Sequence, residues 1–454
     1  MNKLDSEIVA GQLAEAGYAL VDDAADADVV LINTCSVRQH AEEKVWSLLG
    51  TLRHRKAKNP GLVLVVMGCM AQREGERIVR RMPHVDIVCG PMELARLPEL
   101  IASRGLPRPR EGTQDEVPVH PPAGQETRGR QDGTRGRNSH VLAVAEGDLG
   151  SFPRIVQRRP NRFQAFVSIL RGCDNYCSYC IVPYVRGREA SRPVAEIADE
   201  VRRLVADGVK EVTLLGQNVN SYGHALGDGT TLSTLLRQLD RIAGLERLRF
   251  VTSHPKDASD ELFAAMAELP SVCPHLHLPA QAGSNRVLCD MNRRYTREHY
   301  LDRVARAREM VPGIELASDF IVGFPGETEE EFEETVDLVR RVEFQNCFIF
   351  KYSPRPGTRA AKMPDDVPWA TKQARNRRLL AVQEAIMKRR NAALVGQTLE
   401  VLVEGTSKKD AGKLIGRSRA NHIVAFPGDP ALEGQTVRVE IVDSTPLTLF
   451  GKIL

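Results

Sequence analysis

Three cysteines stand close together within the stretch RGCDNYCSYCIVPYVRGRE of this 454-residue chain. Cys173, Cys177 and Cys180 have the spacing C-x3-C-x2-C. Three thiolates on one tight loop can hold three irons of a [4Fe–4S] cube, which leaves the fourth iron open to a small molecule. The alternative is a structural zinc ion, which would want a second C-x2-C-like pair nearby, and the neighbouring sequence has none. The spacing therefore favours an iron–sulfur cluster with an open iron.

Single cysteines follow two predicted strands nearer the N-terminus. Cys35 closes DVVLINTC, and Cys69 closes LVLVVMGC. The carboxyl ends of parallel strands meet along one edge of a sheet, where ligands bind, so two such thiols can share a metal. The spacing is equally consistent with two small buried hydrophobic residues. Cys273, Cys289 and Cys347 lie in helix or strand patterns and are predicted to be core residues.

Alternating strands and helices must position these cysteines. Residues 4–102 contain predicted strands at 28–34, 62–68 and 85–90 with helices between them, which predicts a parallel sheet covered on both faces. A second block contains six predicted strands, at 163–170, 210–216, 248–253, 275–278, 314–322 and 345–352. Six β/α units are too few for a closed barrel and predict an open one, with its chemistry in the loops after the strands.

The rest of the chain differs in composition. Residues 103–162 are rich in Pro, Gly and Arg and predict a largely disordered linker. Residues 391–454 contain short strands split by Gly, Asn, Asp and Pro, which predicts a small all-β barrel. The fold class is thus α/β with a small β domain, in the order 1–102, 103–162, 163–390 and 391–454. The net charge is only +3, so any RNA-binding surface must be local, and no apolar run predicts a membrane span.

The motifs resemble known families. The cysteine loop, after the first strand of a β/α block, resembles the radical S-adenosylmethionine (SAM) superfamily, in which a cluster electron cleaves SAM to a 5′-deoxyadenosyl radical. NTCSVRQHAEEKVWSLLG, GCMAQREGERI, TSHPKD and KYSPRPGTRAA resemble the methylthiotransferase family. That resemblance covers nearly all of the chain outside 103–162. Within the family, the motifs are most similar to the group acting on tRNA that carries N6-isopentenyladenosine.

The resemblance implies an N-terminal methylthiotransferase domain, a radical SAM partial barrel and a C-terminal RNA-binding TRAM domain. It implies two [4Fe–4S] clusters and SAM as cofactors. Cys173, Cys177 and Cys180 match the ligands of the SAM-binding cluster, and Cys35 and Cys69 match two of the three ligands of the other. Contacts to the cofactor are expected at Gln217 and Asn218, which follow the second strand. They are also expected at Ser318, Asp319 and Gly323, in the stretch 318–332 at the end of the fifth strand. Thr328 and Glu331 predict a capping box at the start of the next helix.

The implied reaction adds a methylthio group to C2 of isopentenyl-adenine at tRNA position 37, beside the anticodon. The C2–H bond has no acidic proton, so acid–base catalysis cannot activate it and a radical is required. The implied partners are tRNA and an electron donor such as flavodoxin or ferredoxin, for a cytoplasmic monomer. One alternative is a sister methylthiotransferase acting on threonylcarbamoyl-adenosine tRNA or a ribosomal protein. Another is a non-catalytic, metal-containing RNA-binding protein.

The first residues, MNKLDSE, depart from the family pattern. Family members usually begin with a strand ending in Gly-Cys-Gln, which would supply the third cysteine. Its absence predicts a start site assigned too far downstream or, if the chain is complete, a variant deficient in sulfur insertion. Cys89, after another strand, is a candidate replacement. The chain as written is expected to hold about four irons, and about eight with the upstream codons restored.

Overall fold

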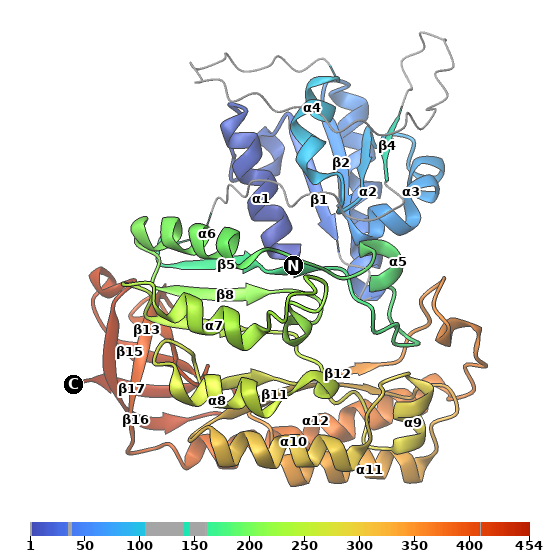
Figure 1. Cartoon of the computed structure of the whole chain (residues 1–454). Helices are drawn as coiled ribbons and strands as arrows, with labels where there is room; N and C mark the ends of the chain where they lie inside the picture. Colours follow the sequence, from blue (N-terminus) through green and yellow to red (C-terminus); the bar gives the residue numbers. More distant parts are fainter. Residues whose placement is uncertain (1, 35–38, 105–139, 145–158, 160, 409) are drawn as a thin grey trace. The chain divides into compact units, whose positions relative to one another are not determined.

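The computed structural model describes residues 2–34, 39–104, 140–144, 159, 161–408 and 410–454 (Figure 1). The chain divides into two compact units, one within residues 2–158 and one within residues 159–454. Cys35 lies outside the described residues. Each unit is described by itself below.

The first unit is a parallel sheet with strand order β1-β2-β3-β4. Its helices are α1 (Asn2–Glu15), α2 (Gln39–Lys58), α3 (Cys69–Arg81) and α4 (Leu97–Ala102). Its strands are β1 (Val29–Thr34), β2 (Val63–Gly68), β3 (Ile87–Cys89) and β4 (Val141–Ala143). Every residue of β2 is buried, as expected for a central parallel strand between two layers of helices. The first three strands confirm the sequence prediction.

Strand β4 was not predicted. Val141 pairs in parallel with Ile87, so β4 extends the sheet beside β3 from within the stretch expected to be a linker. The strand has only three residues, of which Val141 is partly buried, Leu142 is exposed and Ala143 is buried. Three residues are too few for an alternating pattern to be recognised within a Gly- and Pro-rich stretch.

The second unit begins with the predicted open barrel of six parallel strands. They are β5 (Gln164–Ser168), β8 (Glu211–Leu215), β9 (Arg247–Phe250), β10 (His275–His277), β11 (Glu315–Val322) and β12 (Asn346–Lys351). Strands β5-β8-β9 and β10-β11-β12 form two ladders, joined where Leu248 bridges Val272. The short strands β6 (Leu170–Arg171) and β7 (Ala190–Ser191) pair antiparallel beside the cysteine loop.

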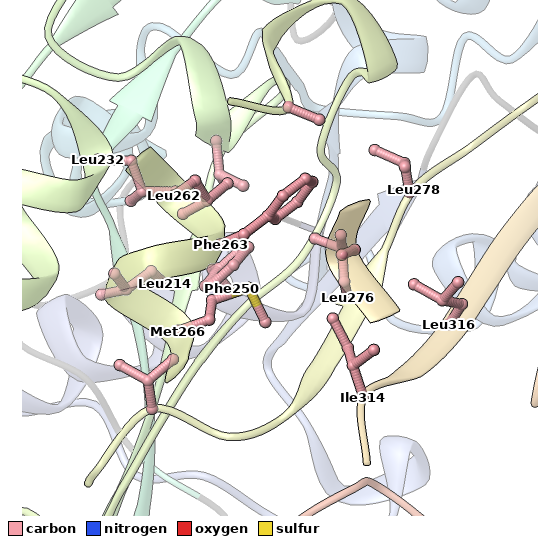
Figure 2. Packing of buried hydrophobic residues seen from close by; sticks show 14 of the residues in the cluster. Leu214, Leu232, Phe250, Leu262, Phe263, Met266, Leu276, Leu278, Ile314 and Leu316 are labelled. Atoms are coloured by element: carbon pink, nitrogen blue, oxygen red, sulfur yellow. The ribbon is translucent and has the colours of Figure 1, made fainter. Parts of the chain in front are cut away.

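Helices cover the outside of this barrel. They are α5 (Val182–Arg186), α6 (Val194–Ala206), α7 (Leu232–Asp240), α8 (Asp260–Glu268), α9 (Asn285–Asp290), α10 (Arg297–Met310), α11 (Glu329–Val342) and α12 (Trp369–Ala392). Figure 2 shows Phe263 and Met266 of α8 packed towards Phe250 of β9, within the cluster that also holds Leu276 and Leu316. Helix α11 begins with the predicted capping box of Thr328 and Glu331.

The C-terminal residues form a closed barrel of five strands in the order β13-β14-β15-β17-β16, as the sequence predicted. The strands are β13 (Thr398–Thr406), β14 (Lys413–Ser418), β15 (Ile423–Pro427), β16 (Thr436–Ser444) and β17 (Leu449–Ile453). The turn between β14 and β15 packs against the amino ends of the large barrel's strands, the end away from the cysteine loop. Arg249 of β9 donates hydrogen bonds to the carbonyls of Ser418 (2.8 Å) and Arg419 (2.9 Å). Arg249 also pairs with the buried Glu211 at 2.8 Å.

Candidate functional site

The cysteine loop leaves the barrel directly after β6, at the carboxyl end of the first strand. Gly172 starts it with φ +75°, and a Cβ atom there would lie 1.8 Å from the carbonyl oxygen of Arg188. Only glycine fits this close approach of two backbone segments. The amide of Cys173 donates to the carbonyl of Gly187 at 3.2 Å, which fixes where the first thiol leaves the sheet. The local fold therefore holds the loop that carries the three thiols.

The three thiols are largely removed from water. Cys177 is 9% exposed, and burial raises the pKa of Cys173 to about 11 and that of Cys180 to about 12. Within the described residues, no three Cys, His, Asp or Glu side chains come together in a way that could hold a single metal ion. A cubane cluster takes one thiolate on each iron, whereas zinc gathers all its ligands on one ion. Three thiols on one loop are the donor set of a [4Fe–4S] cluster that keeps one iron open.

A guanidinium that sequence reasoning missed contacts this loop. Arg293 is 5% exposed, and its Nη1 lies 3.3 Å from the Sγ of Cys177. Its Nε donates to the hydroxyl of Tyr295 at 3.0 Å, and its Nη2 donates to the carbonyl of Pro279 at 2.9 Å. The stretch MNRRYT contains two adjacent arginines, and no pattern in it tells which one is buried.

Polar atoms without partners gather after the next two barrel strands. Both side-chain amide atoms of Gln217, which follows β8, are buried with no hydrogen-bond partner within the described residues. Asn218 donates to Asp257 at 2.8 Å but leaves its Oδ1 unpartnered. The Oγ of Ser253 and the Nε2 of His254, which follow β9, are buried and unpartnered as well. Buried polar atoms of this kind ordinarily bond to something, so they indicate a polar ligand at this end of the barrel.

The ring of His254 is oriented by its own segment. Its Nδ1 accepts a hydrogen bond from the amide of Lys256 at 3.3 Å, so a neutral ring carries its proton on Nε2. Burial, and then the charge of Arg293, lower the pKa of His254 far below its usual range. His254 is therefore a neutral hydrogen-bond donor at this end of the barrel.

Comparison with known proteins identifies the chain. Residues 167–339 match the radical SAM superfamily, residues 1–90 match the uncharacterized protein family UPF0004, and residues 392–454 match the TRAM domain. A tRNA-2-methylthio-N(6)-dimethylallyladenosine synthase of Moorella thermoacetica is 48% identical over 100% of this chain and 96% of its own length. The synthase of Syntrophotalea carbinolica is 44% identical over 97% of this chain and 94% of its own length.

The chain belongs to this synthase family. A solved structure of the radical SAM methyltransferase TsrM from Kitasatospora setae shares the fold, with a TM-score of 0.54 and 17% identity over 80% of this chain and 72% of that one. No helix within the described residues combines the length and the apolar character needed to cross a membrane.

Ser318 and Asp319, two further residues predicted to contact the cofactor, lie on β11 and have hydrogen-bond partners within the barrel. Ser318 is fully buried, and its Oγ accepts from the amide of Ala280 at 2.9 Å. Asp319 lies 3.1 Å from the Nε2 of His277. A Cβ on Gly323 would lie 2.4 Å from the Cγ of Lys372, so glycine is required there to pack against α12. Contact of Gly323 with the cofactor stays a prediction.

The N-terminal sheet of this family member presents its thiols differently. Cys69 is the first residue of α3 and is 5% exposed. Thr34 pairs in register with Gly68, so Cys35 and Cys69 directly follow two paired residues. Cys89 is fully buried in the apolar cluster with Met67, its Sγ 3.5 Å from the carbonyl of Gly90, and burial raises its pKa to about 12. Cys89 therefore has the surroundings of a core residue.

The remaining cysteines divide. Cys273 and Cys347 are buried, as predicted. Cys289 is exposed, so its prediction as a core residue is wrong. Val287 and Leu288 occupy the buried face of the short helix α9, which leaves Cys289 on its outer face.

A cavity of about 560 Å³ lies inside the second unit, between the large barrel and the C-terminal one. Its walls include His277 and Phe348 of the large barrel and Arg417 and Asn421 of the C-terminal one. Phe348 is 46% exposed although it lies on a barrel strand, and its ring meets that of His277 edge-on. An exposed aromatic face beside amide and imidazole groups suits a nucleobase.

Proposed function

We propose that this chain is a radical SAM methylthiotransferase that converts N6-isopentenyladenosine at position 37 of tRNA to its 2-methylthio derivative. The observation that carries the proposal is identity of 44–48% to curated synthases across nearly the whole chain. The three-cysteine loop at the carboxyl end of an open barrel supports the reaction type.

The residues of the large barrel take distinct roles in this proposal. Cys173, Cys177 and Cys180 hold a [4Fe–4S] cluster, which supplies the electron that cleaves SAM when both are bound. The unpartnered amide of Gln217 and the Nε2–H of His254 are placed to bind polar groups of SAM or substrate. Asn218 is held towards the same end by its bond to Asp257. Burial of these groups excludes water, which would otherwise quench reactive intermediates.

The N-terminal sheet carries the sulfur chemistry in this proposal. Cys35 and Cys69 are ligands of a second [4Fe–4S] cluster that provides the sulfur. These two thiols lie far from the barrel loop in the sequence, which is consistent with a second cluster that has a different function. Whether a third ligand is present decides how much sulfur transfer this chain supports.

The C-terminal barrel and the cavity beside it bind the RNA in this proposal. The TRAM match and the exposed Phe348 inside the cavity support an RNA substrate over a protein one. The reaction further requires an electron donor such as flavodoxin or ferredoxin, and we propose a cytoplasmic monomer.

Mass spectrometry of tRNA nucleosides tests the function directly. A strain lacking the gene should lose 2-methylthio-N6-isopentenyladenosine and accumulate the unmethylthiolated nucleoside. Expression of this chain should restore the product, Cys289→Ala should restore it equally, and Cys177→Ala should not. Unchanged 2-methylthio-isopentenyladenosine with loss of the threonylcarbamoyl counterpart would instead identify the sister enzyme. Protein that binds tRNA but yields no 5′-deoxyadenosine anaerobically would indicate a non-catalytic RNA-binding protein.

A further inference from the structure

The surroundings of Arg293 leave its positive charge without a carboxylate. Its polar contacts are the Sγ of Cys177, the hydroxyls of Tyr179 (3.4 Å) and Tyr295, and the carbonyl of Pro279. Within the described parts of the chain, Arg293 makes no ion pair with Asp or Glu, whereas the equally buried Arg249 pairs with Glu211. A buried charge is costly unless an opposite charge lies beside it. The Sγ of Cys177, which is a thiolate when it ligates iron, is the contacting group that would carry an opposite charge.

The same segment holds the cysteine loop from the other side. The side-chain amide of Asn292 donates to the carbonyls of Asn175 (3.2 Å) and Tyr176 (2.9 Å). The amide of Ser178 donates to the carbonyl of Met291 at 3.0 Å. Residues 291–293 therefore contact the loop at several points although they are more than 100 residues away in sequence.

The backbone on both sides of Arg293 adopts the left-handed conformation. Asn292 and Arg294, on either side of Arg293, have φ angles of +57° and +59°. Non-glycine residues in this region cost free energy and persist where the surrounding structure over-determines them, often at functional sites. Arg294, in contrast, is exposed.

We infer that Arg293 is a positioning residue for the barrel cluster: it donates a hydrogen bond to the Cys177 ligand and supplies the buried positive charge that makes the cluster easier to reduce. The inference rests on the proposed function only in taking Cys173, Cys177 and Cys180 as cluster ligands. Hydrogen bonds to cluster sulfurs and the net local charge both set the reduction potential. A nearby cation favours the reduced form, which carries one more negative charge than the oxidised form.

Three variants separate this role from mere support of the loop. The hydroxyl of Tyr295 accepts from the Nε of Arg293 and donates to the carbonyl of Ala280 at 2.6 Å, so Tyr295→Phe removes supporting hydrogen bonds but leaves the guanidinium charge and its contact with Cys177 in place. Arg293→Lys keeps a charge but loses the planar fork that reaches Cys177 and Pro279 together. Arg294→Gln removes a neighbouring exposed charge and serves as the matched control.

The test is a redox titration of the reconstituted full-length protein, followed by electron paramagnetic resonance, with iron content measured in parallel. In Arg293→Gln, the ratio of reduced to oxidised barrel cluster at a fixed potential should fall about tenfold, which is about 59 mV for one electron. In Arg293→Lys, the same ratio of reduced to oxidised cluster should fall about threefold. In Tyr295→Phe and Arg294→Gln, the ratio should match that of the unaltered protein. A potential unchanged in Arg293→Gln would overturn the inference.

If Arg293→Gln holds no iron, Arg293→Lys and Tyr295→Phe test the inference instead. A cluster that is harder to reduce in Arg293→Lys than in Tyr295→Phe supports the inference, and equal reduction potentials in these two variants overturn it. The readout is independent of tRNA, so its failure differs from failure of the proposed function. If the reduction potential shifts as expected in Arg293→Gln but the tRNA assay reveals a different modified nucleoside, the proposed substrate is wrong and the role of Arg293 is supported.

Discussion

The thiols of the barrel loop and those of the N-terminal sheet are held in opposite ways. Cys173, Cys177 and Cys180 lie within eight residues on one loop, and a buried arginine from a segment more than 100 residues away contacts Cys177. Cys35 and Cys69 follow separate strands in the sequence, directly after the paired residues Thr34 and Gly68. The first site is built by local sequence and supported by tertiary contacts, whereas the proposed second site would depend on the register of the sheet. The two should therefore fail differently when altered.

The largest expected effect comes from the barrel loop. Cys177→Ala should abolish the barrel cluster and reduce SAM cleavage to the background of the assay, because one iron loses its only protein ligand. Iron analysis and 5′-deoxyadenosine formation under anaerobic conditions measure this. Cys289→Ala, an exposed cysteine in the same unit, is the control and should retain both. Full cleavage by Cys177→Ala would remove the basis for the barrel site.

A change in the N-terminal sheet should separate the two functions. Cys69→Ala should abolish methylthiolation while 5′-deoxyadenosine formation stays within about twofold, because the barrel loop carries its own three cysteines. The iron content should fall to the four irons or so of the barrel cluster, and the size of the fall measures how much iron the unaltered chain holds at the second centre. A loss of about four irons from a total near eight would show a complete second cluster. Cys89→Ala would then reveal whether Cys89 has become a ligand.

The contact between the two barrels gives a smaller effect on stability. Arg249→Met leaves Glu211 buried without its partner and removes two bonds to the β14–β15 turn, so we expect a loss of about 3 kcal/mol in the free energy of unfolding. The chain has two tryptophans, and in a Trp46→Phe background the fluorescence of Trp369 reports the second unit during urea unfolding. Arg237→Met, which breaks a partly exposed pair with Glu261, should cost less than about 0.5 kcal/mol. Equal losses of unfolding free energy in Arg249→Met and Arg237→Met would show that the contact between the β14–β15 turn and the large barrel adds no stability.

The smallest effect, over the range from pH 7.5 to pH 5.5, is a pH dependence at the same contact. Burial lowers the pKa of His275 to about 3, so the folded protein keeps this ring neutral while the unfolded chain binds a proton near pH 6.5. Stability should therefore fall below pH 6.5, by up to about 1.4 kcal/mol per pH unit, until the folded protein also takes up the proton. Arg249, His277, His422 and Arg417 surround the ring and add to the cost of charging it.

The Trp369 readout checks this between pH 7.5 and pH 5.5. His275→Asn should flatten the slope, and His224→Asn controls for removing a histidine from the surface. An unchanged slope in His275→Asn would show that the neutral state of this ring is not what couples the contact to pH.

Much of the architecture was readable because it is encoded locally. Six barrel strands, five C-terminal strands and the capping box of Thr328 and Glu331 follow from periodicity and turn residues. Strand β4 was missed because three residues carry too little pattern, and Cys289 was misassigned because a helix of six residues does not reveal which face is buried. Such assignments depend on neighbours that lie elsewhere in the chain.

The sequence by itself determined the three-cysteine loop, since ligands within one short loop are close whatever the rest of the chain does. It also determined the candidate amides Gln217 and Asn218, which follow a strand directly. Only the tertiary structure decided that Arg293 and not Arg294 reaches Cys177, because burial depends on packing between segments more than 100 residues apart. It likewise showed that Ser318 bonds to the amide of Ala280 and that Gly323 lies against Lys372 of α12. Residues that are far apart in the sequence, such as Arg293 and Cys177, come into contact only when the chain folds.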